Sequence, residues 1–241
     1  IAEKKGENYL YNLGFEAGLS DWTDLFGPPT QIDNVAPHGG LYSAKKTIVA
    51  IPDNDYFSIV YQDIYYNNQG TPFPANQNVW LTAYVKSNIN VLAQANGGIM
   101  LQYFDASDVA HEIGKSQISA INDWRQLYLT ATIPAGAKRV RVSGFAFAIQ
   151  GDSNAIGGTV NFDDFVYSYT QIPPPPAHTQ LLNVGFENGL NDWDNLYRPA
   201  FVTTEFVHAG SYAAKFTIDE VETDAYRGEL RQEVAAAANK L

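Results

Sequence analysis

Apolar residues recur in short runs over the first two thirds of the chain, and Gly, Pro and Asn separate the runs. Eight such runs cover residues 9–16, 42–51, 56–66, 79–87, 99–106, 124–133, 138–150 and 159–169. Short runs bounded by turn residues predict the strands of a two-sheet sandwich. Val140 and Val142 alternate with Arg139, Arg141 and Ser143, which predicts one buried face and one exposed face. No amphipathic helix is predicted here, and we expect an all-β domain over residues 1–170.

A proline-rich stretch, QIPPPPAH, begins at residue 171, and four prolines in a row cannot join a sheet. We assign residues 171–179 to a linker. Beyond it the chain repeats itself, because NLGFEAGLSDW (12–22) returns as NVGFENGLNDW (183–193) with eight of eleven residues identical. HGGLYSAKKTI likewise returns as HAGSYAAKFTI, and YFSIVYQDI as YRGELRQEV. Residues 180–241 are therefore predicted to be the start of a second, truncated β unit, whose unpaired edges favour pairing with another chain or with the first domain.

Composition narrows the classes of partner. The formal net charge is −11 without a basic stripe, which argues against binding to nucleic acid or an anionic membrane. No apolar run approaches the roughly 20 residues that span a bilayer, so no membrane insertion is expected. The chain has no cysteine, which excludes disulfides and thiolate-bound metals. It starts at Ile1 without a signal-like segment, and we expect a processed or excised piece of a longer protein.

Four motifs occur in one order along residues 8–170: NLGFEAGLSDW, HGGLYSAKKTI, WRQL at 124–127 and FDDFVYSY at 162–169. Together they resemble the β-sandwich carbohydrate-binding modules of the group that contains families 4, 9, 16 and 22. The resemblance implies a galactose-binding-like jelly roll with a structural calcium ion and a groove for polysaccharide or oligosaccharide. It also implies a secreted or cell-surface bacterial protein whose parent chain carries a catalytic domain. Intervening loops match none of these families closely enough to choose one.

A hard cation such as calcium prefers carboxylate and carbonyl oxygens. Glu16, the turn at residues 39–43 and the Asp163–Asp164 pair offer them, and the resemblance implies that they meet where the first and last strands lie side by side. We expect side-chain oxygens from Glu16 and Asp163, and backbone carbonyls around Gly40 and Tyr42. The alternative is that adjacent aspartates simply end a strand facing water.

Sugar binding needs flat aromatic faces flanked by groups that hydrogen-bond to hydroxyls. The candidates are Trp22, Trp80, Trp124, Tyr56, Tyr103 and Tyr128, with the polar residues Gln102, Gln126, Arg141 and Gln150. Each tryptophan also has a structural interpretation: Trp22 as a plug at the end of the core, Trp80 on either the core side or the groove side of its strand, and Trp124 as a core residue instead of a sugar platform. Arg141 and Gln102 are the stronger polar candidates, because an arginine on a central strand is poorly explained by core packing.

Catalytic motifs are missing from the sequence. It contains no Gly-x-Ser-x-Gly elbow, phosphate loop or dinucleotide fingerprint, and its four histidines lack metal-ligand spacing. We therefore predict no catalytic residues. Two alternatives stay open: a jelly-roll polysaccharide lyase that begins at residue 180, with Arg227 contacting an acidic polymer, and an adhesion sandwich with a blocked groove.

Overall fold

The computed structural model describes residues 9–49, 54–66, 72–173, 181–197, 200–205, 207–216 and 228–232, and for 194–197 and 228–229 the backbone alone. Ten strands build the first domain. They are β1 (Thr23–Leu25), β2 (Gln31–Asp33), β3 (Ser43–Thr47), β4 (Tyr56–Ile64), β5 (Gln77–Asn88), β6 (Ala95–Phe104), β7 (Ala110–Ile118), β8 (Ile121–Ile133), β9 (Arg139–Ala148) and β10 (Thr159–Ser168). The described residues contain no helix, and therefore none that could cross a membrane.

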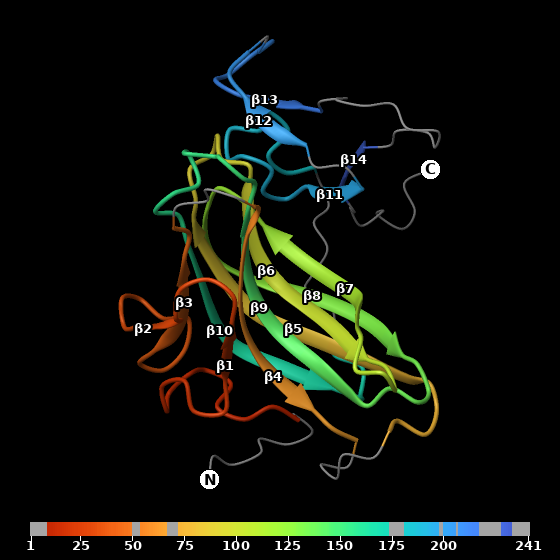
Figure 1. Ribbon diagram of the computed structural model, residues 1–241. Coiled ribbons are helices and arrows are strands. Elements are labelled where there is room, and N and C mark those ends of the chain that lie inside the picture. Colours follow the sequence, from red (N-terminus) through yellow and green to blue (C-terminus); the bar gives the residue numbers. More distant parts are fainter. Residues whose placement is uncertain are drawn as a thin grey trace, which may run out of the picture.

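The ten strands form two five-stranded antiparallel sheets. Sheet A has the order β1-β4-β9-β6-β7, and sheet B has the order β2-β3-β10-β5-β8. Figure 1 shows the two sheets as layers, one behind the other. The predicted all-β sandwich is confirmed.

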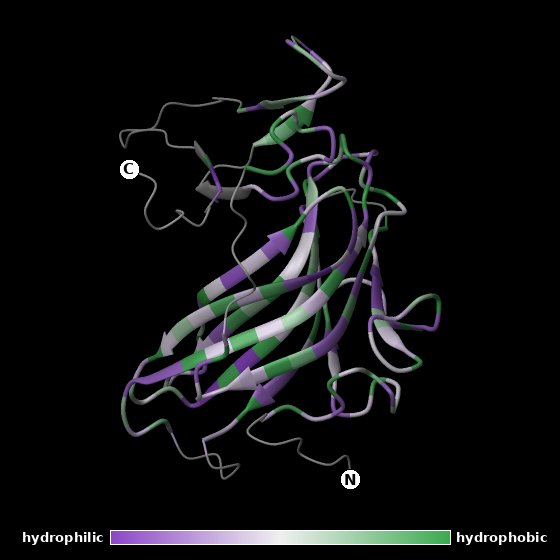
Figure 2. Cartoon of the chain, turned by 180° about the vertical axis from the view of Figure 1, so that it is seen from behind, coloured by the Kyte–Doolittle hydropathy of each residue, from purple (hydrophilic) through white to green (hydrophobic). Residues whose placement is uncertain are grey.

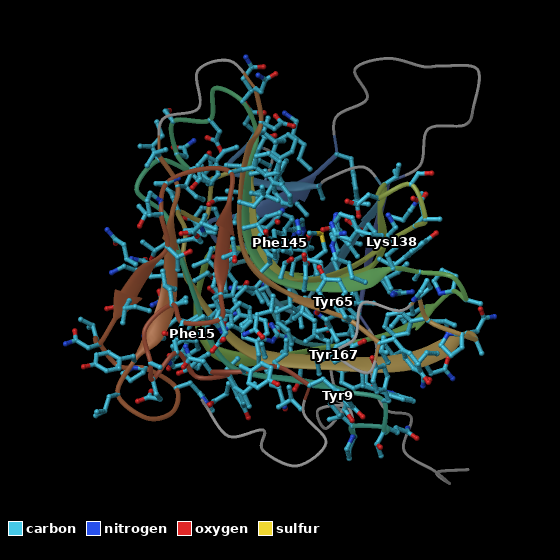
Figure 3. All side chains as sticks on the ribbon, turned by 60° about the horizontal axis from the view of Figure 1, so that its bottom comes forward. Tyr9, Phe15, Tyr65, Lys138, Phe145 and Tyr167 are labelled. Carbon is cyan, nitrogen blue, oxygen red and sulfur yellow. The ribbon has the colours of Figure 1, made fainter. Side chains whose placement is uncertain are left out.

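The main core lies between the sheets and is filled by alternate residues of their strands. Val140 and Val142 of β9 are buried there, as are Leu127 and Leu129 of β8, in agreement with the sequence pattern. Figure 2 shows the same alternation of hydrophobic and hydrophilic residues along the strands. The other side of β9 differs from the prediction of an exposed face, because Arg141 and Ser143 are buried too. That side is the inside of a curve: in Figure 3, sheet A bends into a trough that holds Phe145, while Tyr167 lies on the opposite side.

The strand predicted at residues 9–16 is wrong, since this segment forms consecutive turns. Asn12 and Phe15 have positive φ values of 48° and 58°, which a strand does not allow. The Asn12 side chain holds the turns: its Nδ2 donates to the carbonyls of Gly18 and Ser20, and its Oδ1 accepts from the amide of Ala17. Strands β1, β2 and β7 were not predicted, because two have only three residues and the third is largely polar.

The repeat after the linker reproduces the first pairings of the sandwich. β11 (Asp194–Tyr197) pairs with β14 (Gly228–Arg231) as β1 pairs with β4, and β12 (Phe201–Thr203) pairs with β13 (Ala213–Lys215) as β2 pairs with β3. Most of the predicted linker, residues 174–179, lies outside the described residues, as does Arg227. The boundaries at 170 and 180 stay a prediction.

Candidate functional site

The trough of sheet A carries four rows of side chains that point away from the main core, and we call this surface the concave face. Each row runs across neighbouring strands through residues whose Cα atoms are paired. The rows are Asp63, Arg141, Gln102 and Glu112; Thr23, Tyr61, Ser143, Met100 and Lys115; Leu25, Ile59, Phe145, Gly98 and Gln117; and Phe57, Phe147 and Asn96. The concave face therefore has an aromatic half on β4 and β9 and an amide-bearing half on β6 and β7.

The aromatic half forms a small second core on the concave face. Ile59, Met100 and Phe145 are only 2–3% exposed, although they lie outside the main core. Leu25, Phe57, Tyr61 and Phe147 pack around them and are half-buried. Partly exposed rings around a closed apolar floor can stack against the C–H-rich face of a pyranose ring. The sequence interpretation missed these aromatics, although the alternation in YFSIVYQDI and GFAFA places them all on one face.

Arg141 and Gln102 do lie together on the concave face, as paired residues of β9 and β6. Arg141 is 8% exposed, and its Nε and one terminal nitrogen donate to the two carboxylate oxygens of Asp63 at 2.8 and 2.9 Å. Its guanidinium also lies 3.6 Å above the centre of the Tyr61 ring. Arg141 is thus held by an ion pair and supports Tyr61, whereas Gln102 is half-buried at the edge of the aromatic half.

Trp22 has no open face for a sugar. The side chain is 6% exposed and packs between Phe15 and Phe165, with ring centroids 4.9 Å away in each case. Its indole nitrogen donates to the carbonyl of Asn12 at 3.0 Å. Of the two interpretations of Trp22, the structure supports the core plug. Tyr56 is likewise buried in the main core.

Three other candidates lie on the outer face of sheet B, far from Gln102 and Arg141 in the topology. Trp80 and Gln126 belong to β5 and β8, on the side opposite the buried Leu81 and Leu127. Trp124 lies near them and packs edge-on against His38, which stacks on Tyr84. Tyr128 shares this outer face. The structure therefore divides the predicted sugar contacts between two surfaces.

Tyr103 and Gln150 lie on neither of those surfaces. Tyr103 points to the core side of β6 and stacks on His111, with ring centroids 4.8 Å apart. Gln150 is exposed in the turn after β9. Neither residue can contact a ligand that lies along the middle of the concave face.

The candidate calcium ligands do converge on one turn. Glu16 accepts hydrogen bonds from the amides of Leu41 and Tyr42, and Asp163 accepts from the amides of His38 and Gly39. Both carboxylates thus reach the turn that contains Gly40, although Glu16 lies near the start of the first domain's sequence and Asp163 near its end. Asp164 instead forms a hydrogen-bonded pair with His38, with its Oδ2 lying 2.7 Å from His38 Nδ1.

The chemistry of this turn fits a cation only in part. Asp163 is fully buried, and burial together with the neighbouring Asp164 raises its pKa to about 6, despite the amide donors. A buried carboxylate with a raised pKa is stabilised by a nearby cation. On the other hand, no three acidic or histidine side chains among the described residues form a group that could hold a metal. A calcium ion here would depend on backbone carbonyls and on carboxylate oxygens that also accept amide hydrogen bonds.

The repeated motif has the same conformation in both copies. Asn183 donates to the carbonyls of Gly189 and Asn191, and Trp193 donates to the carbonyl of Asn183, as Asn12 and Trp22 do in the first copy. Glu187 likewise accepts from the amides of Ser211 and Tyr212. The motif is therefore a structural unit, whichever domain it opens.

The second copy is seated on the end of the sandwich. Asn191 is 2% exposed, its Nδ2 donates to the carbonyl of Ile121, and its Oδ1 accepts from the amide of Ser119. Asp192 forms an ion pair with Arg125 at 2.7 Å. A pocket opens at this joint, and its lining includes Asn96, Gln117 and Phe147 of the concave face and Leu190, Trp193 and Phe201 of the repeat. Figure 1 shows the repeat above one end of sheet A.

Comparisons with solved structures find carbohydrate-binding modules that align over about two thirds of this chain. The family 61 carbohydrate-binding module TmCBM61, solved with β-1,4-galactotriose, is 15% identical and aligns over 66% of this chain and 97% of its own, with a TM-score of 0.44. The C-terminal family 22 module of xylanase 10B from Clostridium thermocellum is 18% identical over 68% of this chain and 96% of its own, with a TM-score of 0.47. A xylan-binding family 22 module from Paenibacillus barcinonensis is 16% identical over 69% and 97%, with a TM-score of 0.46.

The comparison with protein-family models and the comparison with curated proteins give no match. Identities as low as those of the solved structures are compatible with very different ligands, since one fold carries many functions. The function must therefore be argued from the residues of the concave face.

Proposed function

We propose that the first domain is a non-catalytic carbohydrate-binding module that holds a glycan chain along the concave face. The observation that carries the proposal is the arrangement of one surface: half-buried rings on β4 and β9 lie beside amide side chains on β6 and β7. Sugars require this combination of flat apolar surface and directional hydrogen bonds. The motif resemblance supports the same class of function.

Phe57, Tyr61 and Phe147 stack against the sugar rings. Gln102 and Gln117 supply amide donors and acceptors for sugar hydroxyls. Affinity should be modest, on the order of micromolar to millimolar, because an open face leaves its hydrogen bonds in competition with water. One end of the trough lies against the repeat, where Asn96 and Phe147 line the joint pocket together with Trp193.

The proposal extends to a structural calcium ion at the turn that joins Glu16 to Asp163. The burial of Asp163 and its raised pKa support it. In keeping with the resemblance, we place the module in a secreted or cell-surface bacterial protein, next to a catalytic domain of the parent chain, with residues 180–241 as the start of a second module.

Affinity gels with soluble glucan, mannan, xylan, galactan and uronic-acid polymers test the proposal, with calcium and with chelator. Retardation by one polymer class without shortening of the polymer is the expected result. Degradation of an acidic polymer would support the lyase alternative, and the absence of retardation by every polymer would leave a structural sandwich.

Two matched variants locate the binding surface. Phe57 and Trp80 are both half-buried aromatics, but Phe57 lies on the concave face and Trp80 on the outer face of sheet B. Phe57→Ala should weaken retention about tenfold, because loss of a stacking ring costs about 1.5 kcal/mol. Trp80→Ala should leave retention unchanged, and the reverse pattern would move the site to sheet B.

A further inference from the structure

Ser143 occupies the centre of the concave face. It belongs to β9, the middle strand of sheet A, and its Cα is paired with that of Tyr61 on one side and Met100 on the other. Both neighbours belong to the small apolar cluster on this face. Although Ser143 points away from the main core, it is fully buried.

The hydroxyl of Ser143 has no hydrogen-bond partner among the described residues. The other buried serines differ in this respect. Ser58 donates to the carbonyl of Phe26 at 3.3 Å, and Ser87 donates to the carbonyl of Ala120 at 2.6 Å. Ser43 accepts from the side-chain amide of Asn161 at 3.3 Å, and Ser168 accepts from the backbone amide of Thr170 at 2.9 Å. A buried hydroxyl without a partner destabilises the folded state, whereas an alanine of nearly the same shape would not.

Met100, the neighbour of Ser143 on β6, has a side chain that moves easily. Met100 is unbranched, with several rotatable bonds, and such side chains adapt to changes in their surroundings at low cost. It is also the single methionine of the chain. A change of its rotamer would open the hydroxyl of Ser143 to a molecule lying in the trough.

We propose that Ser143 is a specificity-determining residue, whose hydroxyl bonds to one sugar hydroxyl in the middle of the trough once the Met100 side chain moves aside. This inference rests on the proposed function of the concave face. A sugar hydroxyl suits the position because it can both donate and accept, as the serine hydroxyl can. A charged ligand group does not suit it, since the surrounding Tyr61, Met100 and Phe145 would leave the charge unpaired in an apolar setting.

The variant Ser143→Ala separates this role from a packing role. With the polymer that retards the wild-type chain in affinity gels, we expect the dissociation constant to rise five- to tenfold, as for the loss of one hydrogen bond. The melting temperature should stay the same or rise. The matched control is Ser58→Ala, a buried serine on the core side of β4 that has a partner: its melting temperature should fall while its affinity stays that of the wild type.

Met100 offers a second readout. In protein labelled with ¹³C at the methionine methyl group, one resonance reports Met100 alone, because the chain has no other methionine. Titration with an oligosaccharide of the retained polymer should shift this resonance, and the same titration of Ser143→Ala should need a five- to tenfold higher concentration.

Each outcome bears on the proposal. The proposal is overturned if the affinity of Ser143→Ala is unchanged. It is also overturned if the Met100 methyl resonance does not shift when the oligosaccharide binds. Both results leave the proposed carbohydrate-binding function intact. A lower melting temperature with unchanged affinity would assign the hydroxyl to a buried water. Failure of the wild-type chain to be retained by any polymer overturns the proposed function and this inference together.

Discussion

The indole N–H of Trp124 donates a hydrogen bond to the backbone carbonyl of Ala36 over 2.9 Å. This bond joins β8 to the loop that leads into the turn held by Glu16 and Asp163. His38, from the same loop, packs against the Trp124 ring and stacks on Tyr84. Trp124 therefore anchors a loop on the outer face of sheet B.

The variant Trp124→Ala should lower stability by roughly 1–3 kcal/mol, because it removes this hydrogen bond and a half-buried ring. Thermal melting measures the loss, and retention of the glycan should not change. Trp124→Phe keeps an aromatic ring but loses the hydrogen-bond donor, so its melting temperature should lie between those of the wild type and Trp124→Ala. A variant with wild-type melting and no glycan retention would restore Trp124 as a sugar platform.

Calcium should raise the melting temperature of the wild-type chain relative to chelator, because a cation offsets the buried charge of Asp163. In Glu16→Gln, the rise in melting temperature on adding calcium should shrink to a small fraction of the wild-type rise. Glu187→Gln is the matched control: Glu187 holds its turn as Glu16 does, but no partner like Asp163 is described near it, so the shift should persist. Equal melting with calcium and with chelator would exclude the ion.

The raised pKa of Asp163 predicts a pH dependence in calcium-free protein. Burial holds the proton on Asp163 up to about pH 6 in the folded state, whereas the unfolded chain releases it near the ordinary pKa of 3.8. The folded state thus binds more protons between these values, and the free energy of unfolding falls as pH rises through this window. Denaturant titrations should show the fall in the wild type and not in Asp163→Asn. The same slope in both proteins would contradict the assignment to Asp163.

The joint between the sandwich and the repeat depends on Asn191, whose counterpart in the first copy is Ser20. A serine cannot both donate to the carbonyl of Ile121 and accept from the amide of Ser119 across the same span, so Asn191→Ser should release the repeat. Small-angle scattering should then show a larger radius of gyration. Unchanged scattering would mean that the ion pair between Asp192 and Arg125, together with the apolar contacts, is enough to hold the repeat on the sandwich.

Much of the fold was predictable because a strand pattern has a period of two. The alternation around Val140 and Val142 identified the core side of β9, and the two copies of the motif indicated a repeated structural unit. A period of two distinguishes two sides of a strand but does not say which sheet the strand joins. For that reason Gln102 and Arg141 were predicted together with Trp80, although they lie on different sheets.

The concave face was predictable only in part, because its side chains resemble core residues. Phe145 and Ile59 are as apolar and as buried as residues between the sheets, but they belong to the separate cluster on the concave face. Figure 3 shows Phe145 in the trough that the curvature of sheet A forms. Curvature arises from twist and pairing over the whole sheet, which no local window of sequence contains. Trp22 was ambiguous for the same reason: the ring that closes over it belongs to Phe165, far away in sequence.

The hydrogen bonds that hold the turns at Asn12 all lie within the eleven residues 12–22. Ala17, Gly18, Ser20 and the indole of Trp22 need no strand of the sandwich to make them. Because local contacts form with little loss of chain entropy, we expect this segment to be ordered while the chain is still being synthesised, long before β10 exists. Pulse-labelled hydrogen exchange at Ala17 would show such early protection, and it would make each copy of the motif a starting point for folding.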